Sequence, residues 1–120
     1  MRLFKNTWFN RFANKAGITN TELREAVNQL EAGQADADLG GNVYKVRVAR
    51  PGEGKSGGFR IIVFFKSEER TFYQYGFAKS DRGNIDQKEL RLYKKMAETK
   101  LSMSEKELAD AVNAGELIEI

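Results

Sequence analysis

The apolar residues of this chain follow two different periods, and the change falls near residue 42. Before that point they recur three and four positions apart, which predicts amphipathic helices. One predicted helix carries Trp8, Phe9, Phe12 and Ala16 on its apolar side and ends near Gly17. A second helix follows, capped by the threonine at position 19 or 21 and ended by the glycine at position 33. Its apolar stripe is Leu23, Ala26, Val27 and Leu30.

From residue 43 the pattern becomes alternating, which is typical of strands. Residues 43–48 place Val46 and Val48 on one face and the basic residues Lys45 and Arg47 on the other. The sequence therefore predicts a strand with one apolar and one positively charged face.

Two further strands are predicted after this one. Residues 59–65 are nearly all apolar, which favours a central strand covered on both faces. Residues 71–78 predict a third strand with Tyr73, Tyr75 and Phe77 on one side. The predicted connections of this antiparallel meander are a hairpin loop over 50–58 and a polar turn over 66–70.

The C-terminal part returns to the helical period. Asp86 with Glu89, and Ser104 with Glu107, have the spacing of capping boxes and predict the starts of two more helices. Residues 117–120 predict an edge strand or a tail that docks elsewhere. The whole pattern predicts one α+β domain over 1–120, with a small antiparallel sheet of three to four strands, two N-terminal helices and C-terminal helices.

Composition restricts the chemistry. The chain has no His and no Cys, so the commonest general base, disulfides and thiol metal sites are excluded. The net charge is only +3, but residues 42–82 hold nine Lys and Arg against four acidic residues. Because this positive charge falls where the strands are predicted, it favours an anionic partner for the sheet. No apolar run reaches the roughly 18 residues of a membrane helix, and we expect a cytoplasmic protein.

A glycine-rich segment, 54–60 (GKSGGFR), lies between two predicted strands. Glycines allow close approach of the backbone to a phosphate, and Lys55 and Arg60 can neutralise one. A nucleotide-binding P-loop is excluded, because Ala49 stands where that motif needs glycine and a strand, not a helix, follows.

Several basic side chains can combine into one site. Antiparallel pairing can bring the Lys45 and Arg47 face close to Arg60 and Lys79. Such a cluster can hold a phosphodiester and stabilise a pentacovalent transition state. Two tyrosines of the third strand can stack on bases or donate a proton. Taken singly, each Lys or Arg is equally compatible with a solvated surface charge.

Three segments carry a family resemblance: 41–49 (GNVYKVRVA), 54–62 (GKSGGFRII) and 75–80 (YGFAKS). With the order of the elements, they resemble the RelE/HigB-type toxins of bacterial toxin–antitoxin pairs, most closely the HigB-like branch with a glycine-rich hairpin. The resemblance covers roughly 20–102 and leaves 103–120 as a C-terminal helical extension. It implies a microbial-RNase-like fold and endonucleolytic cleavage of messenger RNA, usually in the ribosomal A site.

The resemblance also implies a mechanism and partners. In the family the RNA's own 2′-hydroxyl is the nucleophile, and basic side chains replace the His and Glu of secreted ribonucleases. No metal or other cofactor is implied. The implied partners are the ribosome, messenger RNA and an antitoxin, often of the helix-turn-helix type. The predicted catalytic residues are Arg60, Lys79, Tyr73 and Lys45, and the predicted RNA-binding residues are Arg47, Lys55, Arg50, Tyr75 and Arg82.

One departure from the family affects proton transfer. A tyrosine often found after the last strand is absent, and Asn84, Ile85 and Asp86 occupy that region. Tyr73, Tyr75 or a lysine with a lowered pKa could take its place. Two other functions stay open: a ParE-type toxin that poisons DNA gyrase without cleaving RNA, and an RNA-binding module without catalysis.

Overall fold

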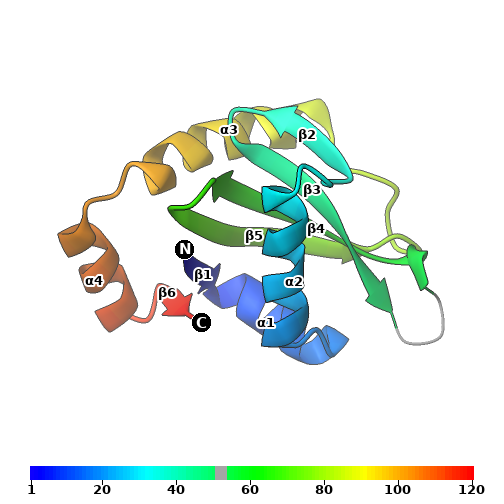
Figure 1. Cartoon of the computed structure of the whole chain (residues 1–120), viewed down its shortest axis with the longest axis horizontal. Coiled ribbons are helices and arrows are strands. Elements are labelled where there is room, and N and C mark those ends of the chain that lie inside the picture. Colours follow the sequence, from blue (N-terminus) through cyan, green and yellow to red (C-terminus); the bar gives the residue numbers. More distant parts are fainter. Residues whose placement is uncertain (51–53) are drawn as a thin grey trace.

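The computed structural model describes the backbone of residues 1–50 and 54–120 and the side chains of residues 1–49 and 57–120. In chain order the described elements are β1 (Arg2–Asn6), α1 (Thr7–Ala16), α2 (Asn20–Glu31), β2 (Ala37–Gly40), β3 (Val43–Arg50), β4 (Gly54–Lys66), β5 (Arg70–Ala78), α3 (Gln87–Leu101), α4 (Glu105–Asn113) and β6 (Leu117–Glu119). Figure 1 shows these elements around one sheet.

The strands form a six-stranded sheet in the order β2-β3-β4-β5-β1-β6. The predicted meander is its centre, since β3, β4 and β5 pair antiparallel. The predicted α+β class is confirmed, but the predicted sheet of three to four strands was too small. Strands from the two ends of the chain complete the sheet, because β1 pairs parallel with β5 and β6 pairs antiparallel with β1.

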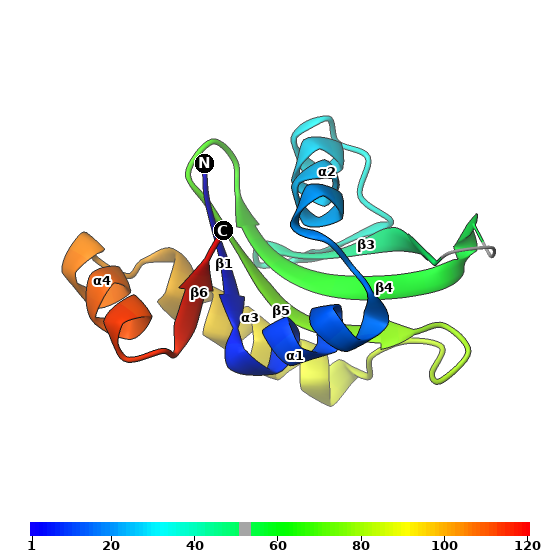
Figure 2. The same cartoon turned by 90° about the horizontal axis from the view of Figure 1, so that it is seen from below.

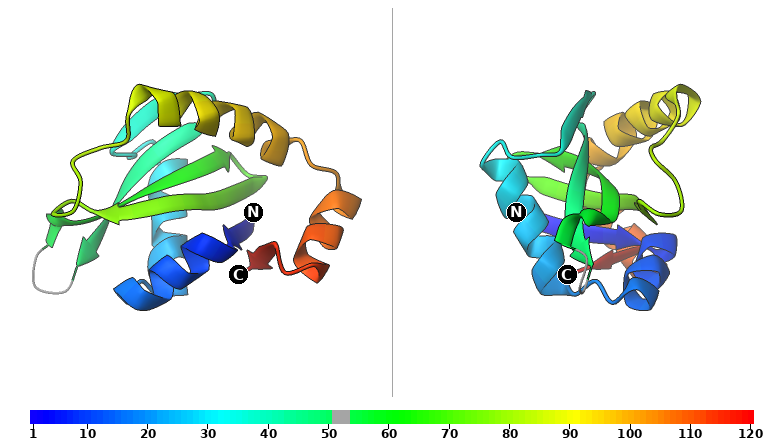
Figure 3. Two further views of the ribbon diagram at one scale, coloured as in Figure 1. Left: turned by 180° about the vertical axis from the view of Figure 1, so that it is seen from behind. Right: turned by 90° about the vertical axis from the view of Figure 1, so that its right-hand side faces the viewer.

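Both faces of the sheet are covered by helices. Figures 2 and 3 show α2 on one face and α3 on the other. The central strand β4 contributes to both cores: Ile61 and Val63 pack toward α2, whereas Ile62 and Phe64 pack toward α3. This confirms the prediction that residues 59–65 are covered on both sides.

Helix α1 packs along an edge of β5. Strand β1 pairs with β5 only as far as Lys5 opposite Tyr73, and α1 begins at Thr7. The helix therefore takes the place beside the second half of β5. Phe12 of α1 packs so closely on Gly76 that an added Cβ there would lie 2.3 Å from its ring. Such close packing explains a glycine in the middle of a strand.

The helix boundaries follow the predicted caps. Thr19, Asp86 and Ser104 each accept a hydrogen bond from the third helical residue, and the glutamate there bonds back to the cap. Helix α1 ends at Gly17, which adopts a φ of 75°. These signals are local in sequence, which is why the sequence predicts them well.

A β-bulge in β5 corrects the predicted strand faces. The register of β4 and β5 shifts between the pairs Ile62–Tyr75 and Val63–Tyr73. Gln74 is the extra residue, so Tyr73 faces α2 while Tyr75 and Phe77 face α3. Strict alternation had placed all three aromatic residues on one side, and that prediction was wrong.

Three segments differ from the prediction in secondary structure. The loop expected over 50–58 is wrong for residue 50, which ends β3, and for 54–58, which belong to β4. Residues 51–53 lie outside the described part. Residues 35–42, for which no element was predicted, contain the short strand β2, which pairs with β3. Strand β1 was not predicted. The alternative that residues 117–120 form an edge strand is confirmed by β6.

Candidate active site

Three basic side chains meet on the α3 face of the sheet, beyond the part that α3 covers. Lys45 and Arg47 project from β3, and Arg60 of β4 lies directly opposite Arg47. Lys45 is partly buried, Arg60 is only 4% exposed, and the Arg47 side chain is 48% exposed. We call these three residues the cationic triad. The antiparallel register of β3 and β4 brings them together, as the sequence predicted.

A carboxylate lies at the centre of the triad. Asp36, one residue before β2, accepts a hydrogen bond of 2.6 Å from Arg47 Nε. Its other oxygen lies 3.6 Å from Lys45 Nζ and 3.8 Å from Arg60 Nε. Like charges directly opposite one another on paired strands are destabilising. Asp36 therefore compensates the repulsion between Arg47 and Arg60.

Aromatic side chains continue this surface across β5. Phe77 pairs with Arg60, and Tyr75 pairs with Ile62 on the same face. The Arg82 guanidinium lies 5.8 Å from the centre of the Tyr75 ring and 5.5 Å from that of Phe77. Arg82 Nη1 also donates to the Tyr75 hydroxyl at 3.3 Å. A fourth cation is thus held over the aromatic side of the site.

Helix α1 adds a further ring to this surface. Trp8 stacks on Tyr75 with their centres 4.8 Å apart, and it stacks on Phe12 of its own helix at 5.3 Å. Trp8 is 46% exposed, although it is the largest aromatic side chain. We call Trp8, Tyr75 and Phe77 the aromatic row. An exposed indole in line with a tyrosine is a suitable surface for stacking a nucleobase.

Hydrogen bonds hold the segment after β5 against the sheet. Glu89 of α3 accepts two hydrogen bonds from Arg82, at 2.6 and 3.1 Å. These bonds are the main reason why the pKa of Glu89 lies below its ordinary value and that of Arg82 above it. Lys45 Nζ donates to Asn84 Oδ1 at 3.5 Å, which links this segment to β3. Burial and the nearby Glu89 raise the pKa of Tyr93 to about 12.

The structure brings together Lys45, Arg47, Arg60, Tyr75 and Arg82 of the predicted residues. Lys79 directly follows β5 and is exposed, with its backbone N–H bonded to Gly58 O. The side chains predicted at positions 50 and 55 lie outside the described residues.

Tyr73 is not part of this surface. It is buried on the α2 face, where its hydroxyl donates to Leu23 O at 2.6 Å. Burial raises the pKa of this hydroxyl well above its ordinary value. The predicted catalytic role of Tyr73 rested on the strict alternation that the bulge breaks, and this geometry does not support it.

Two residues of the site were missed by sequence reasoning. Asp36 belongs to a short acidic connector, and nothing local shows that β2 turns it onto the sheet. Trp8 was assigned to the core because it follows the helical apolar pattern. The sequence holds no signal that separates Trp8 from the core, since positions 8, 9 and 12 lie within about 100° of one another around a helix of 3.6 residues per turn.

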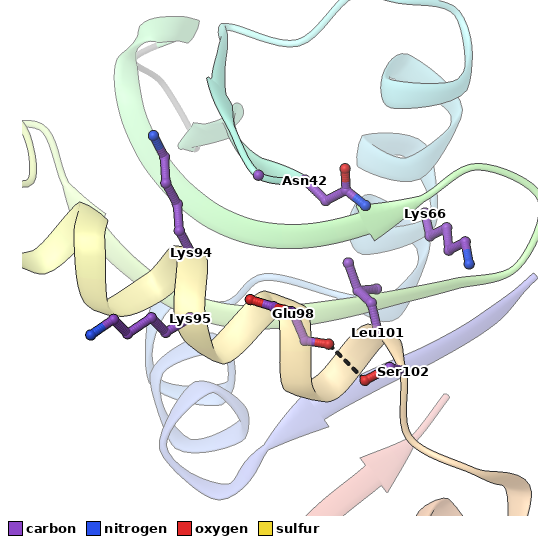
Figure 4. Close-up of a pocket in the computed structure, with 8 residues that line it drawn as sticks. Asn42, Lys66, Lys94, Lys95, Glu98, Leu101 and Ser102 are labelled. Carbon is purple, nitrogen blue, oxygen red and sulfur yellow. Dashed lines mark hydrogen bonds between the residues drawn. The ribbon is translucent and has the colours of Figure 1, made fainter.

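A separate groove of about 510 Å3 lies beside α3 near the turn between β2 and β3 (Figure 4). Its lining includes Lys66, Lys94, Lys95 and Glu98, and the side chain of Lys94 packs against Gly40 and Gly41. The cationic triad does not line this groove. We therefore place the candidate site at the triad rather than in the groove.

Two classes of feature were not found within the described residues. No cluster of three or more Asp, Glu, His or Cys in residues 1–50 and 54–120 could hold a metal ion. Across the same residues, no helix has both the length and the apolar character needed to cross a membrane.

Comparison with known families agrees with the geometry. The family model described as "RelE toxin of RelE / RelB toxin-antitoxin system" matches residues 1–120. The chain belongs to the RelE toxin family. Toxins of this family are paired with an antitoxin and are generally messenger RNA endonucleases that inhibit translation. In this RelE-family toxin, the cationic triad lies beside the aromatic row on the same face of the sheet.

Proposed function

We propose that this RelE-family toxin cleaves messenger RNA at the cationic triad, with the flanking bases on the aromatic row. The convergence of Lys45, Arg47 and Arg60 beside Tyr75 is the observation that carries this proposal. Cleavage by attack of the 2′-hydroxyl needs no protein nucleophile. It needs the phosphate held in place and its transition-state charge neutralised.

Arg60 has the central role in this mechanism. Its side chain is buried between Arg47 on β3 and Phe77 on β5, so its position is fixed before RNA binds. A fixed guanidinium that is shielded from water stabilises developing charge more strongly than a mobile one in water. Lys45 and the more exposed Arg47 hold the same phosphate from the β3 side.

In the proposed reaction, the 2′-oxygen bonds to phosphorus and the bond from phosphorus to the 5′-oxygen breaks. The products are a 2′,3′-cyclic phosphate and a 5′-hydroxyl, so the 2′-hydroxyl loses its proton to solvent water and the 5′-oxygen gains one. We assign donation of the proton to the 5′-oxygen to Tyr75, which then recovers a proton from solvent. An arginine can only donate hydrogen bonds, so the Tyr75 oxygen accepts from Arg82 and its own O–H stays available.

The finer features of this function rest on the family resemblance. We propose that cleavage requires the ribosome, that the toxin acts in the cytoplasm, and that the antitoxin is of the helix-turn-helix type. We also propose membership of the HigB-like branch. The exposed cations around the site, Arg47 and Lys79, are consistent with a large RNA partner.

The test compares two arginine variants on the same sheet. Arg60→Gln removes the proposed transition-state contact, and cleavage should fall on the order of 100-fold. Arg70→Gln is the matched control: its mostly buried guanidinium bonds Met103 O and Glu105, at the α3–α4 connection. Cleavage is measured by mapping new 5′ ends on messenger RNA, with purified ribosomes and in cells lacking the antitoxin.

The same experiment separates the alternatives. Growth arrest and new 5′ ends with wild type and Arg70→Gln, but not with soluble Arg60→Gln, support the proposal. Unchanged cleavage by Arg60→Gln would remove Arg60 from the mechanism. Growth arrest with DNA-damage signalling and no new 5′ ends would favour a ParE-type gyrase poison.

A further inference from the structure

The carboxylate of Asp36 occupies the point at which the three cations converge. Its oxygens lie 2.6 Å from Arg47 Nε, 3.6 Å from Lys45 Nζ and 3.8 Å from Arg60 Nε. Only the contact to Arg47 has the length of a hydrogen bond. The carboxylate is therefore held most closely by Arg47 and lies farther from Lys45 and Arg60. A phosphate, which is larger and has tetrahedral oxygens, can reach all three donors at once.

The position of Asp36 in the chain allows its carboxylate to move away from the three cations. Asp36 lies in the connection between α2 and β2, and the first paired residue of β2 is the next one, Ala37 opposite Lys45. Its backbone is thus outside the ladder that holds the triad. Of the four side chains only that of Arg47 is largely exposed, at 48%, against 15% for Lys45, 11% for Asp36 and 5% for Arg60. An incoming anion would therefore approach from the Arg47 side.

We propose that Asp36 occupies the phosphate-binding position of the free toxin and that the scissile phosphate displaces it. This inference rests on the proposed function, because it takes the triad as the phosphate site. The tethered carboxylate competes with every incoming anion, so RNA binds more weakly than the three cations alone would bind it. It also keeps Arg47 and Arg60 close together before RNA arrives, despite their like charge. Asp36 is a positioning residue that sets the affinity of the site.

The probe for this proposal is a short RNA with a 2′-O-methyl group at every position, which lacks the attacking hydroxyl. Asp36→Asn keeps the size of the side chain and removes its charge. We expect this variant to bind the probe on the order of tenfold more tightly than wild type. The dependence of binding on salt should also become steeper by about 0.7 in log–log slope, since the site carries one more uncompensated positive charge and binding releases about one more counterion.

Asp38→Asn is the matched control. Asp38 is exposed two residues away, and its carboxylate accepts from Gly40 N at 3.0 Å, a bond that asparagine can also accept. The two variants change the net charge equally, so a general electrostatic effect would raise affinity equally in both. Tighter binding in Asp36→Asn alone supports displacement. Equal affinities of the two variants, or weaker binding by Asp36→Asn, would overturn it.

A second measurement uses the unaltered chain, in case Asp36→Asn does not fold. The Arg47 Nε–H signal in NMR spectra should shift as the probe saturates the protein, because its partner changes from carboxylate to phosphate. Bound RNA that leaves this signal unchanged would contradict the proposal. Failure of the proposed function is distinguishable from this outcome: the wild type would then neither bind the probe nor cleave unmodified messenger RNA.

Discussion

Tyr73 and Tyr75 are separated by one bulged residue and have opposite surroundings. The Tyr73 hydroxyl donates to a backbone oxygen of α2 and is buried, whereas the Tyr75 hydroxyl accepts from Arg82 beside the cationic triad. The same chemical change, removal of one hydroxyl, can therefore separate a structural role from a catalytic one.

We expect Tyr75→Phe to lower the rate of messenger RNA cleavage by about 100-fold, the effect of losing a general acid. Tyr73→Phe should leave that rate near wild type and lower the free energy of unfolding by about 1 kcal/mol, since a buried hydrogen bond is lost. Single-turnover cleavage and urea denaturation measure the two effects. A loss of activity in Tyr73→Phe, with Tyr75→Phe unaffected, would reverse the assignment.

Single residues of the site were predictable only in part. Lys45, Arg47 and Arg60 were found because alternation and antiparallel pairing bring basic residues to one face. Tyr73 was misplaced because a bulge leaves no clear signal in the sequence. Asp36 was missed because its role depends on the pairing of β2 with β3, which is a contact between elements and not a local pattern.

The ion pair of Arg82 with Glu89 predicts a pH effect. Hydrogen bonds from Arg82 lower the pKa of Glu89 in the folded state below its value in the unfolded chain. The pair therefore stabilises the fold above the unfolded pKa, about 4.3, and this contribution is lost as the pH falls through the lower folded pKa. The melting temperature of Glu89→Gln should lie below that of wild type at pH 6, and the difference should shrink in acid.

A titration followed by NMR provides the control for this effect. In Arg82→Gln the pKa of Glu89 should rise toward its ordinary value, because the main cause of its depression is removed. An unchanged Glu89 pKa in that variant would show that the backbone N–H of Asp86, which also bonds Glu89, is responsible instead.

At the scale of elements, the docking of α1 on β5 joins the core to the site. Phe12 packs on Gly76 and on the Phe59 ring, and Trp8 of the same helix stacks on Tyr75. The position of the aromatic row therefore depends on how closely α1 approaches β5.

Gly76→Ala should lower the free energy of unfolding by about 1–3 kcal/mol, because the new Cβ would lie 2.3 Å from the Phe12 ring. Phe12 stacks on Trp8 and meets the Phe59 ring edge-on, which restricts the ways in which the Phe12 ring can move aside. Urea denaturation measures the effect, and Gly83→Ala is the control, since nothing lies within 4 Å of its added Cβ.

A double-mutant cycle tests the cause of this destabilisation. In a Phe12→Leu background the clash is relieved, so Gly76→Ala should be less destabilising there than in wild type. Equal effects in both backgrounds would mean that Phe12 is not the obstacle.

The elements themselves were largely predictable where their signals are local. Capping boxes and apolar periods located α2, α3, α4 and the three central strands. Strand β1 has only five residues, two of them basic, and it pairs with residues about 68 positions away, Arg2 with Arg70. Pairing with distant strands stabilises β1, whereas its own sequence pattern does not distinguish it from the start of a helix.

At the scale of the whole molecule, the sheet separates the site from the place where the chain ends meet. The triad lies on β3 and β4, near one edge, whereas β1 and β6 form the other. Arg2 bonds Glu119 and pairs with Glu105, and Leu117 is buried in the core beneath α4. Substitutions that weaken the packing of β1 and β6 should therefore differ from those that lower the rate of RNA cleavage.

Leu117→Ala tests this separation, since it removes a side chain that is 5% exposed. We expect the free energy of unfolding to fall by about 2–4 kcal/mol, through lost apolar contact and the cavity that remains. Cleavage at a temperature well below melting should stay near wild type, because β5 and the whole of β4 lie between β6 and Lys45. The paired measurements are urea denaturation and single-turnover cleavage. A large loss of cleavage in folded Leu117→Ala would show that the two edges are coupled through the sheet, and the site could then not be treated as a property of β3, β4 and β5 alone.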